Sequence, residues 1–439
     1  MAQHKMHLVG FLKTGPTSHH HGMWRHMDTD VGDLLSPERY EHIAQVLERG
    51  CFDGCFFADF LGLSDHYQGS FEASLGLGGQ LSLLDPLLVL PLMARVTSRL
   101  GLGVTLSTTF YEPHHIARTF ATLDHLTKGR VAWNVVTSNS VIEARNHGLD
   151  QLPHRDIRYA RAREVVEACQ ALWRCWDEDV LLLDKASGAF ADYRKVRYAD
   201  YVGEHVRARG PLSVPRSPQV SPVIMQAGSS EQGRQFAAQH AEIVYTILAD
   251  KPQMQAFYRD IKRRVADAGR RPEQCAILPS IDVVLGETES IAREKAEHLA
   301  QLIHPKLAMG LLSMHLGIDF SQYDPQCPIA DIQPGEGSLG QFEMVRATAS
   351  AENLTLAETA RRYGAGAMSP QVVGTPSQVA DYLQALFTEQ ACDGFMLAPT
   401  TYPATFEQFV RSVVPELQQR GLFRTEYRGT TLREHLNES

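Results

Sequence analysis

Eight short strand-like runs, separated by helical patterns, constrain the fold of this chain most. Several are apolar throughout rather than alternating, which is typical of parallel strands buried on both faces. The predicted strands are His7–Leu12, Gly54–Asp59, Leu100–Ser107, Val131–Thr137, Pro222–Gly228, Glu242–Leu248, Ala276–Gly286 and Gly394–Pro399. Eight strand–helix units predict an α/β protein with a TIM (β/α)8 barrel, and a doubly wound sheet is the alternative.

Amphipathic segments lie between the predicted strands. The clearest is "SPERYEHIAQVLERG" (Ser36–Gly50), which has a Ser cap, Pro at the first helical position and a closing Gly. The other predicted helices are 85–98, 114–127, 157–176, 230–240, 251–268, 288–304, 376–390 and 405–419.

Three stretches are longer than an ideal barrel needs. They cover about 60–84, 177–221 and 304–370. Loops this long in a compact domain usually form lids, pocket walls or interface elements. We therefore expect residues 1–439 to form one barrel domain that carries these three insertions.

Charge and apolar patterning exclude some partners. The formal net charge is −9, which argues against nucleic acid or an anionic membrane, because both need clustered Lys and Arg. The apolar run Leu81–Ala94 is cut by Asp85, Pro86 and Pro91 and is too short to span a bilayer. The N-terminus lacks a signal-peptide pattern, and the seven cysteines form no C-x-x-C pair. We expect a cytoplasmic protein without structural disulfides or zinc.

Polar residues gather where several predicted strands end. "GRVAWNVVTS" (Gly129–Ser138) begins as a buried strand and finishes in hydroxyls and amides. Asp59, Thr105 to Thr109 and Gly228 to Ser230 end three other strands in the same way. The carboxyl ends of barrel strands form the active face, so a shared pocket is expected there. The alternative for any single strand is that loops are simply hydrated.

"QAGSSEQGRQFAA" (Gln226–Ala238) predicts an anion site. A strand enters Gly228, which lets a ligand approach the backbone, and Ser229 and Ser230 then open a helix. Free N–H groups and the positive end of the helix dipole favour a phosphate. An ordinary Ser N-cap explains the serines but not the glycine.

A second segment could contribute to the same phosphate site. "PHRDIRYARAREVVE" (Pro153–Glu167) places four side chains that could bind a phosphate at the start of a helix: His154, Arg155, Arg158 and Tyr159. Cations at a helix N-terminus oppose the dipole, so a bound anion would offset that cost. The alternative is a set of surface ion pairs with Asp156 and Glu164.

Histidines are the remaining catalytic candidates. His19 and His21 follow the first strand, and His315 lies in the third insertion. Adjacent histidines cannot all face one metal, and no H-E-x-x-H accompanies them, so no metal site is predicted. A structural role for each histidine stays open. The chain also lacks a G-x-S-x-G elbow, a P-loop and a G-x-G-x-x-G motif, which indicates that a cofactor does the chemistry.

The longer motifs resemble a known family. "GRVAWNVVTS", "EARNHGLDQ", "RYARARE", "SVPRSPQVSPVIMQAGSSEQGRQFAA", "DGFMLAP" and "FVRSVVPELQQRGLFRTEYRGTTLREHL" resemble the bacterial-luciferase-like, FMN-dependent monooxygenases. The match is to the nitrilotriacetate, EDTA and dibenzothiophene-sulfone monooxygenase group and covers nearly the whole chain. "HGMWRH", "ERGCFDGCFFAD" and "LGLGGQ" look nearest to the sulfone branch.

The resemblance implies a luciferase-like barrel and a two-component reaction. A separate NAD(P)H-dependent flavin reductase supplies FMNH2, which binds non-covalently and reacts with O2 to give a C4a-(hydro)peroxyflavin. One oxygen atom enters a small organic substrate, with a sulfone or another heteroatom compound as candidates, and the other leaves as water. The resemblance also implies a homodimer or homotetramer. The alternatives are an oxidoreductase coupled directly to NAD(P)H or F420, and a non-catalytic flavin-binding protein of the same fold.

The resemblance also assigns roles to residues. Those expected around the isoalloxazine and ribityl groups are Asp59, Thr105, Ser107, Asn134 and Ser138. Those expected at the phosphate are Tyr159, Ser229 and Ser230. The family commonly has a His four residues before the Tyr; that position is Arg155 here, and His154 lies one place earlier. His21 and His315 match histidines near the flavin or substrate in related enzymes. The candidate walls of the substrate pocket are His19, Trp24, Phe57, Phe60, His66, Tyr67 and His315.

Overall fold

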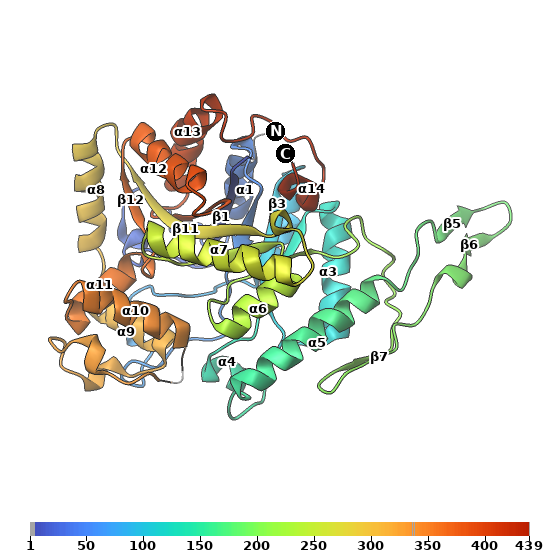
Figure 1. The fold of residues 1–439 in the computed structure, drawn as a ribbon, viewed down its shortest axis with the longest axis horizontal. Coiled ribbons are helices and arrows are strands. Elements are labelled where there is room, and N and C mark those ends of the chain that lie inside the picture. The colour runs from blue at the N-terminus through green and yellow to red at the C-terminus, as the bar shows by residue number, and fades with distance from the viewer. Residues whose placement is uncertain (1–4, 336, 338, 439) are drawn as a thin grey trace.

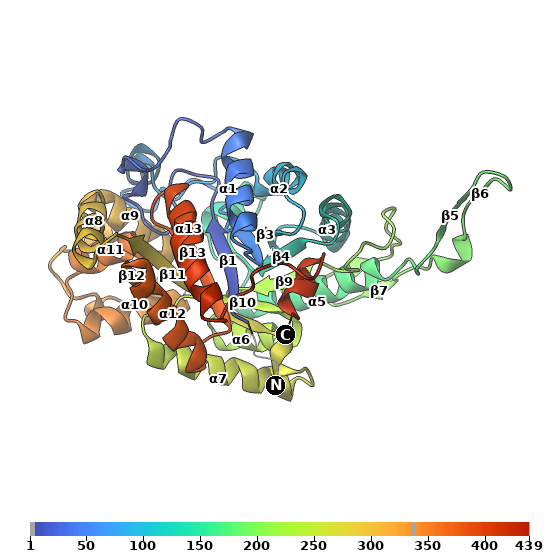
Figure 2. The ribbon, with the colours of Figure 1, turned by 90° about the horizontal axis from the view of Figure 1, so that it is seen from above.

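The eight predicted strands close into a parallel barrel in the computed structural model, which describes residues 5–335, 337 and 339–438. Closure follows because β1 pairs with both β2 and β13, while β10 pairs with β11. The TIM barrel is thereby confirmed over the doubly wound alternative (Figures 1 and 2). The barrel strands are β1 (His7–Leu12), β2 (Gly54–Phe57), β3 (Gly101–Ser107), β4 (Val131–Val136), β9 (Val223–Gln226), β10 (Ile243–Thr246), β11 (Ala276–Leu285) and β13 (Gly394–Pro399).

Helices cover the outside of the barrel, as Figure 2 shows from above. The first begins at Pro37 and ends before Gly50, as its sequence predicts. The helices between barrel strands are α1 (Pro37–Arg49), α2 (Pro86–Arg95), α3 (Pro113–Thr127), α4 (Val141–Asn146), α5 (Arg155–Trp173), α6 (Glu231–His240), α7 (Lys251–Asp267), α8 (Glu289–Gln301) and α12 (Pro376–Thr388). After β13 come α13 (Ala404–Gln419) and α14 (Leu432–Leu436). Short 3-10 turns span Met23–Arg25, Tyr193–Lys195, Pro272–Gln274, Phe320–Gln322 and Ile329–Asp331.

Alternation along the strands sorts side chains between the barrel interior and the helix layer. Val9 and Phe11 of β1 pack with Phe56 of β2 and Met225 of β9, so these residues fill the interior. In β4 the interior residues are Ala132 and Asn134, because Trp133 packs outward, its ring centroid 5.4 Å from that of Phe120 in α3.

The interior rows become polar toward the carboxyl ends of the strands, which we call the mouth. In β11 the inward row runs from Ala276 and Leu278 to Ser280 and Asp282. The row of β1 continues past Phe11 to Lys13, which is buried. The barrel interior is therefore filled with apolar side chains toward the amino ends of the strands and with titratable groups at the mouth.

A short strand that the sequence did not predict pairs with the upper half of β11. β10 pairs with β11 only over Ala276–Pro279. Beyond that point β12 (Gln371–Gly374) pairs with Asp282–Leu285, while β13 stays on the other side of β11. The tops of β10 and β11 therefore diverge at the mouth.

The three long stretches have different structures. Residues 60–84 contain a π-helical turn over Glu72–Gly76. Residues 177–221 include two antiparallel hairpins, of which the first extends far from the barrel (Figure 1). The first hairpin joins β5 (Leu181–Asp184) to β6 (Ala189–Ala191), and the second joins β7 (Tyr201–Val202) to β8 (Arg207–Ala208). Residues 304–370 carry α9 (Pro305–Leu316), α10 (Leu339–Ala351) and α11 (Leu356–Gly366), which share a core of their own.

A buried ion pair ties the C-terminal segment to the amino end of the barrel. The Arg424 guanidinium donates to Asp53 Oδ1 at 2.7 Å, and His7 Nδ1 lies 2.9 Å from the same oxygen. Both Arg424 and Asp53 are buried. Among the described residues, no helix is long and apolar enough to cross a bilayer.

Candidate functional site

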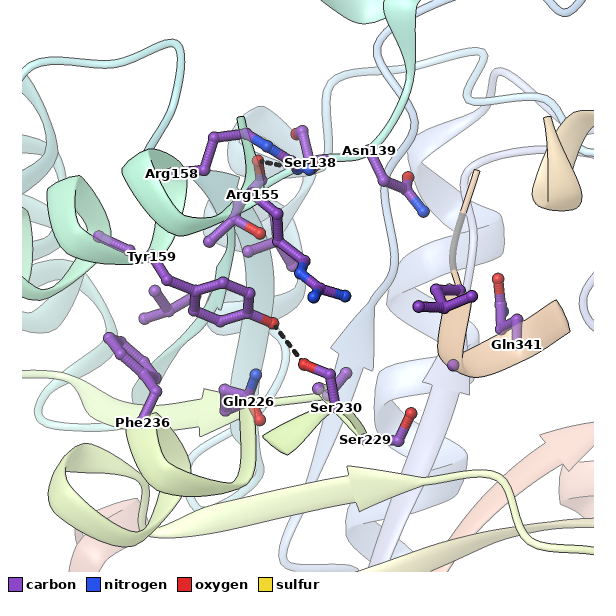
Figure 3. A pocket seen from close by; sticks show the side chains of 18 of the residues that line it. Ser138, Asn139, Arg155, Arg158, Tyr159, Gln226, Ser229, Ser230, Phe236 and Gln341 are labelled. Atoms are coloured by element: carbon purple, nitrogen blue, oxygen red, sulfur yellow. Dashed lines mark hydrogen bonds between the residues drawn. The ribbon is translucent and has the colours of Figure 1, made fainter. Parts of the chain in front are cut away.

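A cavity of about 530 Å³ opens at the carboxyl ends of β4 and β9. Its walls come from the loop after β4, the start of α5, the turn between β9 and α6, and the start of α10 (Figure 3). Six of the predicted cofactor-binding residues line it: Ser138, His154, Arg155, Tyr159, Ser229 and Ser230. Asn139, Phe236 and Gln341 also line the cavity and were not predicted, and Gln341 comes from the distant third insertion.

The turn between β9 and α6 has the form expected of an anion site. Ser230 caps α6, and its Oγ accepts a hydrogen bond from Gly233 N at 3.2 Å. A Cβ at Gly228 would lie 3.0 Å from Gly233 Cα and 3.2 Å from the Tyr159 hydroxyl, so the glycine lets the turn pack closely against α6 and Tyr159. The helix end therefore presents free N–H groups and two hydroxyls to the cavity.

Two basic residues of α5 line this cavity. The Arg155 side chain points into the cavity toward Tyr159 and Ser230 (Figure 3). Arg158 also lines the cavity, and its Nε and Nη1 donate to the carbonyl oxygens of Pro153 and Thr137, at 3.0 and 3.2 Å, and to that of Ser138. Arg158 is therefore in the predicted pocket, where it also holds the loop after β4.

His154 lies at the surface beside Asp156, one of the partners named for it in the alternative interpretation. It caps α5, and its Nδ1 lies 3.3 Å from Asp156 Oδ2. Its side chain is exposed at the rim of the cavity.

The loop after β4 is held in an uncommon backbone conformation. Ser138 has φ of 51°, in the left-handed region that a residue with a Cβ rarely adopts. Its Oγ donates to Ser107 Oγ at 3.0 Å, and Arg158 bonds its carbonyl. These contacts turn the Ser138 segment into the cavity wall.

The other predicted flavin residues lie beside this wall, at the mouth. Asn134 Nδ2 donates to Thr105 Oγ1 at 3.0 Å, and Thr105 donates to the carbonyl of Phe57 at 2.9 Å. The amide oxygen of Asn134 is buried and has no hydrogen-bond partner among the described residues. Asp59 accepts from Phe60 N at 2.9 Å, and burial raises the pKa of its carboxyl.

The three candidate histidines lie at the mouth and are neutral in its buried surroundings. Burial lowers the pKa of His19 and of His21 well below the usual value, and that of His315 to about 3. His21 Nδ1 lies 2.8 Å from the carbonyl oxygen of His19. His315 Nδ1 lies 2.6 Å from the Tyr363 hydroxyl of α11.

Titratable residues that sequence analysis missed surround these histidines. Burial lowers the pKa of Lys13 to about 7 and raises that of Asp282 well above its usual range. Glu143 in α4 lies beside Asp59 instead, and burial raises the pKa of its carboxyl to about 7. The available signal for Asp282 was its place in the otherwise apolar run "AILPSIDVVLG", two positions after Ser280 and therefore on the same face of the strand.

The predicted substrate-pocket residues do not all face the mouth. Trp24 Nε1 donates to the Leu77 carbonyl at 3.1 Å and so packs under the first insertion. Phe60 and His66 are half-buried in the loop after β2. Phe57 differs from expectation: its ring is buried in the helix layer, with its centroid 6.1 Å from that of Tyr40, because odd and even positions of β2 face opposite sides.

No group of three or more His, Cys, Asp or Glu side chains within residues 5–335, 337 and 339–438 is arranged to hold a metal ion. The site instead combines an anion-binding turn with buried, titratable side chains at the barrel mouth.

The fold and the cavity together define a (β/α)8-barrel protein with a ligand site at the carboxyl ends of its strands. The model of the luciferase-like monooxygenase family matches residues 12–413. The chain belongs to this family. The expected class of enzyme, a monooxygenase, is thereby confirmed.

Individual relatives match over nearly the full length. Dibenzothiophene-sulfone monooxygenase from Rhodococcus erythropolis (strain XP) is 48% identical, with 99% of this chain and 97% of the relative covered. Nitrilotriacetate monooxygenase component A from Aminobacter aminovorans is 40% identical, with 95% and 93% covered. The crystal structure of a riboflavin lyase with modified FMN and riboflavin has a TM-score of 0.89 at 32% identity, covering 99% of this chain and 96% of that one.

Proposed function

We propose that this chain is the oxygenase component of a two-component system. It takes FMNH2 from a separate NAD(P)H-dependent flavin reductase and uses O2 to oxygenate a small sulfone or related heteroatom compound. The observation that carries the proposal is the anion-binding turn of Ser229 and Ser230, which meets Arg155 and Tyr159 in a cavity at the barrel mouth.

The residues present fit a phosphorylated flavin. The α6 N-terminus and Arg155 would hold the phosphate, because a dianion complements both the helix dipole and a guanidinium. Two buried oxygens, Asn134 Oδ1 and Gln226 Oε1, have no partner among the described residues and would accept hydrogen bonds from ribityl hydroxyls or ring N–H groups. A solved relative holds modified FMN, which supports this choice of ligand.

The flavin, when bound, supplies the reaction with oxygen, and the chain's own residues supply binding, orientation and shielding. The loop at Ser138 and the start of α10 both contribute to the cavity walls and would shield part of a bound flavin from bulk water. The titratable residues at the mouth, including His19, His21 and His315, would exchange protons with the reacting groups.

The substrate class rests on the relatives. A sulfone monooxygenase is 48% identical to this chain over nearly the full length of both proteins.

The partner is a flavin reductase. The name "component A" of one relative indicates a system of more than one component, and this supports a separate source of FMNH2. A homodimer or homotetramer remains our expectation. The exposed leucines of the β5–β6 hairpin, Leu181, Leu182 and Leu183, are the surface whose substitution by Asp tests it in light scattering.

The function is tested with purified protein and a panel of sulfones, aminopolycarboxylates, thioethers and alkanes. Turnover should require an added flavin reductase, NAD(P)H, FMN and O2 together. Turnover with NADPH and no reductase, or turnover without oxygen, would contradict the proposal. Product from an aminopolycarboxylate but not from dibenzothiophene sulfone would overturn the substrate class alone.

A further inference from the structure

A chain of three polar side chains lies at the mouth, at the place where β10 and β11 diverge. His19 occupies this gap, with its Nε2 3.1 Å from the Tyr245 hydroxyl of β10. Its Nδ1 lies 3.6 Å from Asp282 Oδ1 and 3.3 Å from Ser280 Oγ, both in β11. The two imidazole nitrogens therefore connect two different strands.

Asp282 is the unexplained member of this chain. Its side chain is fully buried, and neither carboxylate oxygen has a hydrogen-bond partner among the described residues. A Cβ at Gly366, the last residue of α11, would lie 2.5 Å from Asp282 Oδ2, so the carboxyl fills space left by a glycine. A buried acid without bonded partners is costly and needs a reason to be there.

We propose that Asp282, His19 and Tyr245 form a proton relay that delivers a proton to an anion at the barrel mouth. Asp282 and His19 are positioning residues that act through Tyr245, the half-exposed end of the chain. A monooxygenase releases one oxygen atom as water, so protons must reach oxygen inside a site from which bulk water is excluded.

The relay balances as a sequence of single proton shifts. The Asp282 carboxylic acid gives its proton to His19 Nδ1, His19 Nε2–H gives its proton to the Tyr245 oxygen, and Tyr245 O–H gives its proton to the anion. The net change moves one proton from Asp282 to the anion and leaves a carboxylate. Solvent restores the proton along the same chain between turnovers.

The protonation states that burial favours are those the relay needs at its start. Burial raises the pKa of Asp282, which keeps it a carboxylic acid, and lowers the pKa of His19, which keeps it neutral. Lys13 interacts electrostatically with Asp282 and would stabilise the carboxylate product. The titratable and charged groups facing His19 are Lys13 after β1, Tyr245, Asp282, His21 on its own segment and His315 of α9.

The decisive variant is Asp282→Asn. The amide has nearly the shape of the carboxyl and can occupy the same place, 3.6 Å from His19 Nδ1, but it cannot give up its proton. We expect turnover to fall at least about 100-fold, as for loss of a general acid, with little change in Tm or in FMN binding. The turnover of Tyr245→Phe should fall by a similar factor. The double variant should lose no more turnover than either single variant, because both substitutions interrupt the same relay.

Asp124→Asn is the matched control, since Asp124 is also fully buried but accepts hydrogen bonds from Gln219 in the helix layer. Its turnover should change less than about threefold relative to any change in folded fraction. Additive losses in the double variant, or turnover of Asp282→Asn within threefold of the wild type, would overturn the relay.

A second measurement does not depend on turnover. Histidine ¹⁵N spectra of the ligand-free protein, with the His19 signals assigned through His19→Asn, report which ring nitrogen carries the proton. We expect a neutral His19 protonated on Nε2 at neutral pH, in both the wild type and Asp282→Asn. A charged His19, or one protonated on Nδ1, would overturn the relay even if the proposed flavin reaction holds. Failure of the flavin reaction would leave this result intact.

Discussion

The Tyr159 hydroxyl lies 3.5 Å from the Ser230 hydroxyl, so α5 and the N-terminus of α6 meet across one wall of the cavity (Figure 3). The two residues are separated by 71 positions in the sequence, and the long hairpin insertion lies between their helices. Their contact places a phenol, a helix N-terminus and the Arg155 guanidinium around the same space, which is the basis of the phosphate assignment.

Replacing Ser229 and Ser230 together by Asp should abolish FMN binding. Two carboxylates would repel the phosphate, whereas Asp is itself a good N-cap, so α6 should remain stable. Fluorescence titration with FMN measures the loss, and thermal unfolding verifies the fold. Thr288→Asp, at the N-cap of α8, is the matched control and should bind FMN normally. Unchanged affinity in the double variant would remove the phosphate assignment.

Arg155→Ala should weaken FMN binding about tenfold, because one exposed charge-assisted contact to the phosphate is lost. Riboflavin, which has no phosphate, should bind equally well to both proteins. Arg163→Ala, on the same helix, should leave both affinities unchanged. An equal loss for FMN and riboflavin would place Arg155 at the ring instead of the phosphate.

Glu143 should make stability depend on pH. Its pKa is raised to about 7 by burial, so between about 4.5 and 7 the folded state holds more protons than the unfolded state. The free energy of unfolding should therefore fall as pH rises through this range, by on the order of 3 kcal/mol. Denaturant unfolding at several pH values measures the slope, which Glu143→Gln should reduce and Glu167→Gln, at an exposed site, should leave unchanged. A wild-type slope that survives in Glu143→Gln would refute this origin.

Arg424→Met should destabilise the protein by about 3–5 kcal/mol, because it leaves the Asp53 carboxylate buried without its charged partner. Guanidinium unfolding measures the change. Arg293→Met, which removes an exposed ion pair to Glu289, is the comparison and should have little effect. Equal effects of the two variants would show that the buried pair contributes no more than a surface one.

The barrel could be predicted from the sequence because its strands are short apolar runs with clear helix signals between them. Which face of each strand points into the barrel could not be predicted. Phe57 and Phe56 are adjacent in a wholly apolar run, and only their packing shows that Phe56 fills the barrel while Phe57 joins the helix layer. The β12 strand was missed because four residues carry too little pattern.

The phosphate turn was predictable because glycine, serines and a helix start are contiguous. The rest of the site depends on contacts distant in sequence. Gln341 reaches the cavity from the third insertion. His19, Tyr245 and Asp282 come together only because β10 and β11 diverge beside the segment after β1, and no local pattern encodes that divergence.

The most direct measurement supplies dibenzothiophene sulfone, photoreduced FMN and ¹⁸O₂ to the purified chain and analyses the product by mass spectrometry. We predict a product that carries one ¹⁸O atom and forms only when reduced FMN and oxygen are both present. A product without ¹⁸O, or product formed equally well when oxidised FMN replaces reduced FMN, would contradict a reduced-flavin oxygenase.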